Sequence, residues 1–392
     1  MRICDITQAY HAAGGGVRTY IGHKQEFLAA AGHDHLILVP GARDQVEPNG
    51  RCVMRVVASP GVPGSPPYRL LTRWLAVRAA LRDFKPDVIE FGDPYLAGWA
   101  AVAHAREFPG TTVVAFCHTD TPRAYVQPVV RGLFGIRAAR LAKKWATRYV
   151  ASLHAVCDAV VVASPVVARS FTRQGTRRVT TIPLGVDTTV FHPGRRCEAL
   201  RTALGVPEGG FLLVYAGRLN NEKRTPVLLD ALTALPRDLP VVAALIGDGT
   251  ERPAALDAAA RDDRLRVLPF TADRSALATL LASADLYVTA APFETFGLSI
   301  LEAQASGLPV AGVRGGALVD RVPPDLGALA TPDSPQDLTA CISRLLRADL
   351  RASGDRARAA AERYSWDRTF TALLSLYHER HAGAAHPSLR SA

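Results

Sequence analysis

The chain has few cysteines and no long hydrophobic run. Its 392 residues include six scattered cysteines without a Cys-x-x-Cys pair, so neither a disulfide framework nor a zinc site is indicated. No apolar run approaches the roughly 18 residues that span a bilayer, and the N-terminus lacks the apolar core of a signal peptide. We therefore expect a cytoplasmic protein that is soluble or lies peripherally on the inner face of the cell membrane.

Acidic residues are in the minority. The chain carries 46 Lys and Arg against 36 Asp and Glu, a formal net charge of +10. This excess favours an anionic partner, such as a sugar nucleotide, an acidic membrane surface or nucleic acid, and charge alone does not choose among them. With 48% hydrophobic residues, a chain of this length can bury two cores.

Short apolar runs with strand character alternate with helical patterns along the whole chain. The expected strands are 2–6, 36–39, 53–57, 88–91, 113–116, 159–163, 179–182, 211–216, 241–246, 265–268, 286–289 and 309–313. The expected helices include 17–31, 68–83, 226–234, 251–261, 276–282 and 298–306. This alternation predicts an α/β protein with two doubly wound parallel sheets and crossover helices.

A segment rich in prolines and turn residues predicts the division between two domains. We expect a first domain over 1–183, a linker over 184–194 and a second domain over 195–365. The segment 366–381 has amphipathic spacing, so it should pack as a helix.

Two glutamates lie eight residues apart around a glycine that opens a predicted helix. Glu294 falls in the loop between a strand and this helix, and Glu302 falls on its second turn. The first helical amides, at Phe296, Gly297 and Leu298, lack intrahelical partners and suit a phosphate or sugar hydroxyls. The pattern indicates a sugar-nucleotide site, although two exposed surface glutamates explain the spacing equally well.

Cationic and glycine-containing loops follow two strands of the second domain. Arg218 and Lys223 come after 211–216, at the carboxyl end of a parallel strand, where open α/β sheets bind ligands. Arg can fork onto two phosphate oxygens, and Lys supplies a mobile charge. Gly247 and Gly249 form a second glycine loop. Its Asp248 is interpreted as a helix cap.

A nucleotide-dependent oxidoreductase is not favoured. Gly15 and Gly16 follow the first strand without G-x-G-x-x-G spacing, and the second strand ends in Val39-Pro40-Gly41 without an acidic residue for a ribose. Glycines at a helix start still permit close approach of a phosphate, and a surface turn explains them equally well.

Several motifs in the second half occur in a characteristic order and spacing. They are Gly217-Arg218 with Glu222-Lys223, then Ile246-Gly247-Asp248-Gly249, Phe293-Glu294-Thr295-Phe296-Gly297, Leu301-Glu302-Ala303 and Gly307-Leu308-Pro309-Val310. This set resembles the donor half of the family 4 retaining glycosyltransferases with the GT-B fold, and the resemblance covers nearly the whole chain. It implies two Rossmann-like domains facing across a cleft, the first binding the acceptor and the second the donor. The segment 366–381 would be the helix that crosses back to the first domain.

The resemblance also implies roles for individual residues of the donor half. Arg218 and Lys223 would hold the diphosphate, Glu294 would contact the donor sugar's hydroxyls, and Glu302 would take the ribose hydroxyls. The amides of Phe296, Gly297 and Leu298 would complete the pocket, with the loop of Gly247 and Gly249 beside it. The base would meet the chain near 267–270, where nothing distinguishes uracil from guanine.

In the first domain the resemblance points to two further places. Gly15 and Gly16 match the glycine loop that closes on the phosphates. Phe116-Cys117-His118-Thr119-Asp120 matches the segment whose histidine faces the donor sugar, so His118 is a candidate catalytic residue. Asp120 is a candidate for orienting the acceptor hydroxyl or acting as base. A lone histidine is otherwise more often structural.

The expected chemistry is transfer of a glucose- or mannose-type hexose from a nucleoside diphosphate sugar. Its transition state is oxocarbenium-like, so the departing diphosphate must be stabilised. No metal or other cofactor is expected, because cations can serve the leaving group and the sequence offers no Asp-x-Asp motif. Retention in this family is attributed to same-face attack assisted by the leaving phosphate, so no carboxylate nucleophile is assigned.

Two basic segments containing tryptophan, 69–85 and 131–149, suggest an anionic lipid surface. Ordinary helices with solvated basic faces explain them equally well. Because the region after His118 also resembles lipid-glycosylating members, we favour a lipid hydroxyl as acceptor and no nucleic-acid partner. A soluble sugar, cyclitol or antibiotic core stays open, as do a sugar-nucleotide epimerase, a phosphorylase and a noncatalytic sugar-nucleotide binder.

Overall fold

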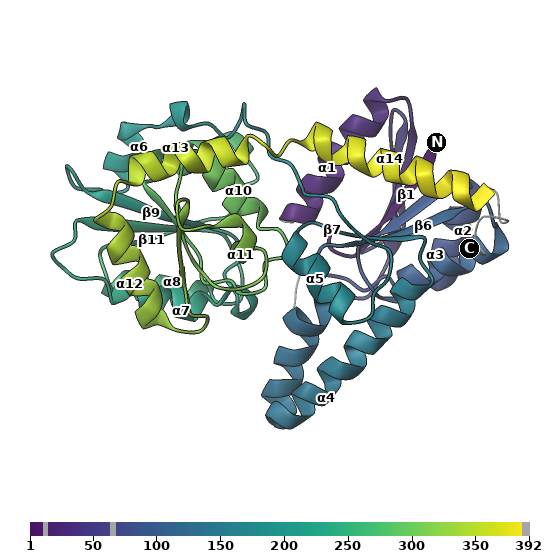
Figure 1. The fold of residues 1–392 in the computed structure, drawn as a ribbon, viewed down its shortest axis with the longest axis horizontal. Coiled ribbons are helices and arrows are strands. Elements are labelled where there is room, and N and C mark those ends of the chain that lie inside the picture. Colours follow the sequence, from purple (N-terminus) through teal and green to yellow (C-terminus); the bar gives the residue numbers. More distant parts are fainter. Residues whose placement is uncertain (11–14, 63–67, 386–392) are drawn as a thin grey trace. The chain divides into compact units, whose positions relative to one another are not determined.

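The computed structural model describes residues 1–10, 15–62 and 68–385. The chain divides into two compact units, each with its own sheet (Figure 1). The first unit is Met1–Pro183 together with the last helix, and the second unit is Leu184–Ser365. The predicted α/β class with two doubly wound sheets is confirmed.

Most strands of the first unit are followed by a helix. Its elements are β1 (Arg2–Ile6), α1 (Gly16–Ala30), β2 (Asp34–Gly41), β3 (Gln45–Asn49), β4 (Cys52–Ala58), α2 (Trp74–Phe84), β5 (Val88–Phe91), α3 (Leu96–Glu107), β6 (Thr112–Cys117), the π-helical turn η1 (Pro122–Val126), α4 (Gln127–Ala155), β7 (Ala159–Val162), α5 (Pro165–Arg173), β8 (Val179–Thr181) and α14 (Trp366–Ala385). Strands β2, β3 and β4 follow one another directly. The sheet order is β3-β4-β2-β1-β5-β6-β7-β8. Strands β5, β6 and β7 are buried throughout, as expected for a parallel sheet covered on both faces.

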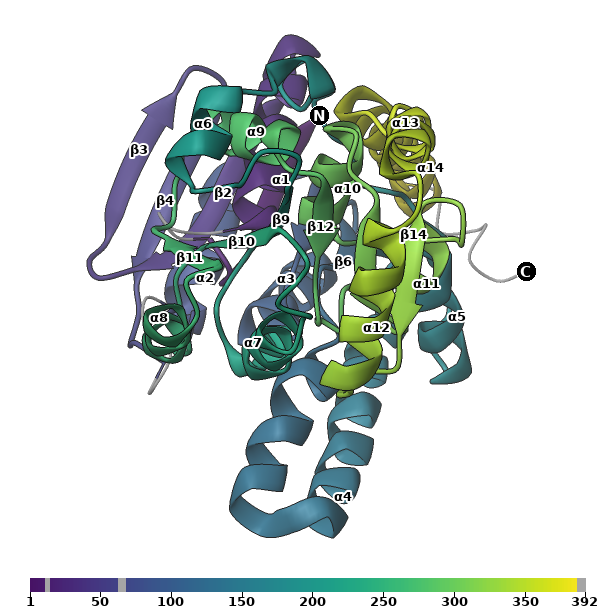
Figure 2. The ribbon, with the colours of Figure 1, turned by 90° about the vertical axis from the view of Figure 1, so that its left-hand side faces the viewer.

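The second unit contains a smaller sheet. Its elements are η2 (Pro193–Arg195), α6 (Glu198–Ala203), β9 (Phe211–Ala216), η3 (Asn221–Lys223), α7 (Thr225–Thr233), β10 (Val241–Ile246), α8 (Arg252–Arg261), β11 (Leu265–Leu268), α9 (Arg274–Ser283), β12 (Leu286–Val288), α10 (Leu298–Ala305), β13 (Val310–Val313), α11 (Leu318–Arg321), β14 (Gly327–Ala330), α12 (Pro335–Leu346) and α13 (Leu350–Ala361). Its pairings are parallel in the order β11-β10-β9-β12-β13-β14, and Figure 2 labels β11, β10, β9, β12 and β14 of this sheet. This is the doubly wound order 3-2-1-4-5-6, whose switch point lies between β9 and β12.

One expected element has different bounds, and two strands were not predicted. The helix expected over 68–83 begins at Trp74, because the preceding residues are extended and form a bridge between Gly61 and Arg69. Strand β3 was missed because it is polar and exposed throughout, and it pairs antiparallel with β4 at the sheet edge. Strand β14 was missed because its four residues, two of them alanines, carry little strand character.

The helix α4 is bent back on itself. Gly135 has φ 78° and ψ 180°, which interrupts the helical backbone and requires the conformational freedom of glycine. Figure 1 shows the two resulting arms side by side, extending from the first unit's sheet as a hairpin. The basic segment predicted over 131–149 therefore contains the turn of this hairpin rather than one straight helix.

Candidate functional site

The loops after β9 and β12 meet at the switch point of the second sheet. Lys223 ends the short helix η3 in the first loop, and Glu294 lies in the second. The Nζ atom of Lys223 lies 2.5 Å from Oε1 of Glu294. The structure thus brings together two predicted site residues that are 71 positions apart in the sequence.

A second cation completes this cluster. Nη2 of Arg218 lies 2.7 Å from Oε2 of Glu222, whose other oxygen lies 4.0 Å from Lys223. Burial alone lowers the pKa of Lys223, but the carboxylates of Glu294 and Glu222 outweigh burial and raise it. Lys223 therefore stays protonated at neutral pH, as a diphosphate ligand requires.

A glycine loop missed in the sequence holds Glu294. The backbone N–H of Ala317 donates to the Glu294 carbonyl at 2.7 Å. Gly316 has φ 50°, and a Cβ there would lie 2.2 Å from the same carbonyl oxygen. A Cβ on Gly315 would lie 2.5 Å from the carbonyl of Pro292. The close approach explains both glycines and fixes the backbone that carries Glu294.

The helix α10 begins at Leu298, as predicted, and Gly297 precedes it with φ 77°. Arg321 braces this turn, because its Nε donates to the Phe296 carbonyl at 3.1 Å and its guanidinium lies 4.2 Å from the Phe296 ring. Burial lowers the pKa of Arg321 to about 10. The brace leaves the first amides of α10 at the carboxyl end of the sheet, where an anion can bind.

The second predicted glutamate has a partner that sequence reasoning missed. Glu302 is 3% exposed, and its Oε1 lies 2.6 Å from Nη2 of Arg274 on α9. The Arg274 guanidinium also lies 4.7 Å from the ring of Phe191. Burial raises the pKa of Glu302, and Arg274 opposes the rise. A ribose reaching Glu302 would therefore meet an arginine as well.

The glycines of the β10–α8 loop have a packing role. A Cβ on Gly247 would lie 1.9 Å from the Gly217 carbonyl oxygen, and one on Gly249 would lie 2.2 Å from that of Leu219. Because these residues are glycines, the β10–α8 loop can pack closely against the loop that carries Arg218. The interpretation of Asp248 as a helix cap was wrong, because α8 is preceded by Glu251 as its N-cap residue.

In the first unit, His118 follows β6 and is held between aromatic rings. Its imidazole stacks on Phe116 at 4.5 Å with an interplanar angle of 12°, and it meets the Tyr20 ring nearly edge-on at 5.0 Å. Burial lowers the pKa of His118 to about 4, with a further contribution from Lys24. The imidazole is neutral at pH 7, so it can accept or donate a hydrogen bond without carrying charge.

A buried charged network lies next to these rings. Nζ of Lys24 lies 2.7 Å from Asp5 and 3.0 Å from Glu90. The hydroxyls of Tyr20 and Tyr377 donate to Glu90 at 2.8 and 2.5 Å. Burial raises the pKa of Glu90 to about 7 against the pull of Lys24. The sequence did not reveal this network, because its members come from β1, α1, β5 and α14.

The other predicted site residues of the first unit, Asp120, Gly15 and Gly16, lie outside the aromatic cluster around His118. The Asp120 carboxylate accepts from the Arg123 N–H at 3.3 Å and lies 3.5 Å from the Arg123 side chain, so it caps the start of η1. Burial raises its pKa. Gly15 and Gly16 open α1 and are exposed. A Cβ on Gly15 would meet nothing within 4 Å, so packing does not account for that glycine.

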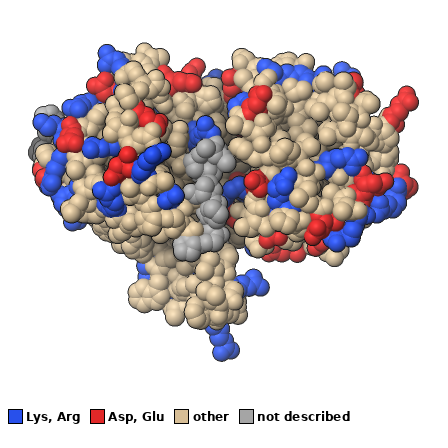
Figure 3. Space-filling view, turned by 180° about the vertical axis from the view of Figure 1, so that it is seen from behind, with Lys and Arg blue, Asp and Glu red and all other residues tan. Residues whose placement is uncertain are grey.

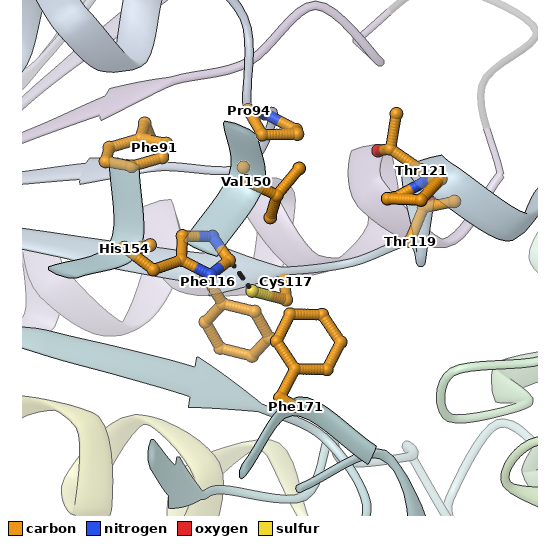
Figure 4. Close-up of a pocket in the computed structure, with 12 residues that line it drawn as sticks. Phe91, Pro94, Phe116, Cys117, Thr119, Thr121, Val150, His154 and Phe171 are labelled. Atoms are coloured by element: carbon orange, nitrogen blue, oxygen red, sulfur yellow. Dashed lines mark hydrogen bonds between the residues drawn. The ribbon is translucent and has the colours of Figure 1, made fainter. Parts of the chain in front are cut away.

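An apolar pocket lies where the α4 hairpin joins the first unit. Figure 4 shows Phe91, Phe116 and Phe171 around His154, whose Nε2 lies 3.7 Å from the Cys117 sulfur. Burial lowers the pKa of His154 to about 4, so the described lining is uncharged at pH 7. The described lining offers no cation for a phosphate.

In the described part of the chain, no helix is long and apolar enough to cross a membrane. Nor does any group of three His, Cys, Asp or Glu among those residues have a metal-binding arrangement.

Two doubly wound units, with cations, carboxylates and helix amides at the switch point of one, define the class of GT-B transferases. Comparison with a solved structure supports this fold. The sucrose-phosphate synthase of Thermosynechococcus elongatus superimposes with a TM-score of 0.79 at 21% identity, over 97% of this chain and 99% of that one.

Sequence comparison identifies the family. Residues 14–190 match the model of Glycosyltransferase Family 4, and residues 210–348 match that of Glycosyl transferases group 1. The chain is 33% identical over 382 residues to the GDP-mannose-dependent alpha-(1-6)-phosphatidylinositol dimannoside mannosyltransferase of Mycobacterium tuberculosis, covering 96% of this chain and 95% of that protein. It is 38% identical to the D-inositol 3-phosphate glycosyltransferase of Saccharomonospora viridis, over about half of each chain (51% and 50%).

The chain belongs to glycosyltransferase family 4. It is a glycosyltransferase that moves a hexosyl group from a nucleotide sugar, as the motifs predicted.

Proposed function

We propose that the enzyme transfers a mannosyl group from GDP-mannose to a hydroxyl of an inositol-containing lipid, with retention of configuration. The mycobacterial relative, which matches over nearly the full length, is named for a GDP-mannose donor and a phosphatidylinositol dimannoside acceptor. The observation that carries the donor side is the cluster of Lys223, Arg218 and Glu294 at the switch point.

In this proposal, Lys223 and Arg218 exchange their glutamate partners for the diphosphate. A dianionic ligand between the two cations replaces the two ion pairs by several charge-assisted hydrogen bonds. Once Lys223 has left Glu294, that carboxylate can accept hydrogen bonds from the sugar hydroxyls. The amides at 296–298, where the loop leads into α10, would meet the donor's oxygens, and Glu302 with Arg274 would meet the ribose.

The departing diphosphate carries the charge that develops as the glycosidic bond breaks. Cations already positioned for it lower the barrier without reorganisation. We assign the loop of Gly247 and Gly249 to support of the phosphate loop, and Gly15 and Gly16 to the phosphates. His118 is assigned to the donor sugar as a neutral hydrogen-bonding group. Asp120 is assigned an indirect role on the acceptor side, because its carboxylate caps the turn η1 there.

A soluble cyclitol is the second candidate acceptor. The relative from Saccharomonospora viridis is named for D-inositol 3-phosphate, and its identity of 38% extends over 217 residues. Both candidate acceptors contain an inositol ring. They differ in whether that ring carries a lipid.

Ligand-induced thermal stabilisation followed by a transfer assay tests this function. A nucleotide at about 100 times its dissociation constant should stabilise the protein by about 2.7 kcal/mol, and we expect GDP and GDP-mannose to do so more than UDP and UDP-glucose. In EDTA, labelled mannose should pass to phosphatidylinositol mannosides in vesicles.

Each component of the proposal has its own contrary result. Preference for UDP would overturn the guanine donor, and transfer only to free inositol phosphate would overturn the lipid acceptor. Nucleotide binding with neither transfer nor hydrolysis would indicate a noncatalytic binder. Isomerised sugar nucleotide formed without an acceptor would indicate an epimerase.

A further inference from the structure

The turn of the α4 hairpin exposes a continuous group of apolar side chains. Every residue from 131 to 137 is exposed. Leu133 and Phe134 are 71% and 73% exposed, and Ile136 follows directly after the break at Gly135. Soluble proteins rarely leave such large apolar side chains together in water, so the cluster indicates an interaction surface.

The returning arm of the hairpin continues this apolar surface. Leu141, Trp145 and Tyr149 are spaced by four residues, which places them on one side of a helix. They are all exposed, Trp145 by 61%. Trp and Tyr are the side chains that prefer the boundary between water and lipid headgroups. The apolar stripe therefore runs from the turn along the arm.

The charges of the hairpin are of one sign. Between residues 121 and 157 the sequence has seven Lys and Arg and no Asp or Glu. Among the described residues, no ion pair within 4.0 Å involves the six cations of α4. They are Arg131, Arg137, Arg140, Lys143, Lys144 and Arg148. Figure 3 shows the protruding hairpin with blue and uncharged surface and no red. Such a surface complements an anionic partner.

The other basic segment of the first unit differs in this respect. On α2, Arg82 lies 2.9 Å from Glu107, which Arg78 also contacts, and Arg73 lies 2.6 Å from Asp44. These pairs neutralise much of the segment 69–85. Of the two segments predicted to meet a membrane, only the hairpin combines cations that lack an ion pair within 4.0 Å with a large exposed apolar cluster in the described structure.

We propose that the α4 hairpin is the membrane-docking element of this enzyme, with its turn inserted into the headgroup region of an anionic bilayer. Leu133, Phe134 and Ile136 would enter the acyl boundary, and Trp145 would lie at the headgroup level. The long cationic side chains can reach lipid phosphates while their stems stay in apolar surroundings. The inference rests on the proposed use of a membrane lipid as acceptor.

Vesicle flotation of the full chain tests the docking surface. Wild-type protein should float with phosphatidylcholine vesicles that contain phosphatidylglycerol and remain behind with phosphatidylcholine alone. Leu133→Ser with Phe134→Ser should reduce the partition coefficient by roughly tenfold or more, because each apolar side chain loses its burial. Two matched controls, Leu256→Ser on α8 and Leu75→Ser on α2, also replace exposed leucines and should float as the wild type does.

Tryptophan emission provides a second readout. Insertion should shift the emission to shorter wavelength on anionic vesicles, and Trp145→Phe should remove most of that shift. Arg137→Glu with Lys144→Glu should weaken partitioning by at least about tenfold, and added salt should weaken the wild type in the same way.

Three outcomes would overturn the inference. They are unchanged flotation of the Leu133 and Phe134 variant, equal binding to neutral and anionic vesicles, or loss of flotation in the Leu75 variant alone. A different result would show that the surface joins two copies of the chain. In that case the wild type would not bind vesicles but would form a concentration-dependent dimer, and the Leu133 and Phe134 variant would not form it. GDP binding is measured in every variant, so failure of the donor site is distinguished from failure of docking.

Discussion

The ammonium group of Lys223 has two carboxylates within 4.0 Å. In the proposed function it binds a ligand with more negative charge than either. Such an arrangement keeps an ammonium group protonated and positioned without burying an unpaired charge. Arg218 is held similarly by Glu222. At the scale of single residues, the proposed donor site is therefore a set of ion pairs that could exchange partners.

Replacing Lys223 by Ala should weaken GDP binding by about 1.5–3 kcal/mol, the usual contribution of a hydrogen bond to a charged group. Arg218→Ala should act in the same direction. Isothermal titration calorimetry measures both effects, and Arg237→Ala serves as the matched control, because this exposed arginine pairs with Asp262 and Asp263. Unchanged affinity in both site variants would contradict the phosphate assignment.

Two arginines of the site had no recognisable pattern in the sequence. Arg274 reaches Glu302 from α9, and Arg321 braces Phe296 from α11. Both contacts join segments that are more than 20 residues apart and depend on the order of strands in the sheet. A basic residue in a helix has no local feature that reveals such a partner.

Among the elements, α14 is bound to the first unit by buried polar contacts as well as by apolar packing. The Tyr377 hydroxyl accepts from Lys24 at 2.8 Å and donates to Glu90. On the same helix, Phe370 packs between Tyr20 and Phe27. The helix thus supports the side chains that hold His118.

Tyr377→Phe should destabilise the first unit by about 1–3 kcal/mol, because a buried lysine and a buried glutamate each lose a hydrogen bond. Urea unfolding followed by tryptophan fluorescence measures this, because all four tryptophans, at 74, 99, 145 and 366, belong to the first unit. Tyr149→Phe, which removes a half-exposed hydroxyl bonded to Trp99, is the control. Equal destabilisation by both changes would refute a special role for the buried hydroxyl.

Most elements followed from local patterns. Strands 2–6, 88–91, 211–216, 241–246 and 265–268 were predicted with the bounds that the structure shows. These strands are short and mostly apolar, and such runs are easy to recognise. The hairpin turn was not predicted, since a glycine inside a helical pattern does not reveal that the chain reverses there.

At the scale of the whole molecule, each unit contains its own cluster of charged side chains. The second unit holds the partly buried cations Arg218 and Lys223, which we propose bind an anionic ligand, and the first holds a buried network around Glu90. Within the first unit, groups with opposite pKa shifts oppose each other in the pH dependence of stability.

The pKa of Glu90 rises from 4.5 to about 7 on folding. Between these values the folded state holds a proton that the unfolded state has lost, so this group makes stability fall as pH rises. His118 and His154, with pKa values lowered from 6.5 to about 4, act in the opposite direction, because the unfolded state takes up protons first as pH falls.

Glu90→Gln should therefore leave the histidine contribution unopposed. Its stability curve between pH 5 and 6.5 should rise more steeply than that of the wild type, by up to about 1.4 kcal/mol per pH unit. Urea unfolding at several pH values measures the slope, with the exposed Asp83→Asn as control. Parallel curves for Glu90→Gln and the wild type would show that Glu90 does not titrate in this window.

The sequence by itself determined the fold class, the family and the loops to which the donor site is assigned in our proposal, because strands, glycine turns and helix starts depend on residues close together in the chain. Only the tertiary structure decided which side chains meet. The pairs of Lys223 with Glu294 and of Arg274 with Glu302, the network around Glu90, and the reversal at Gly135 arise from strand order and packing. These join distant segments, and no local pattern encodes them.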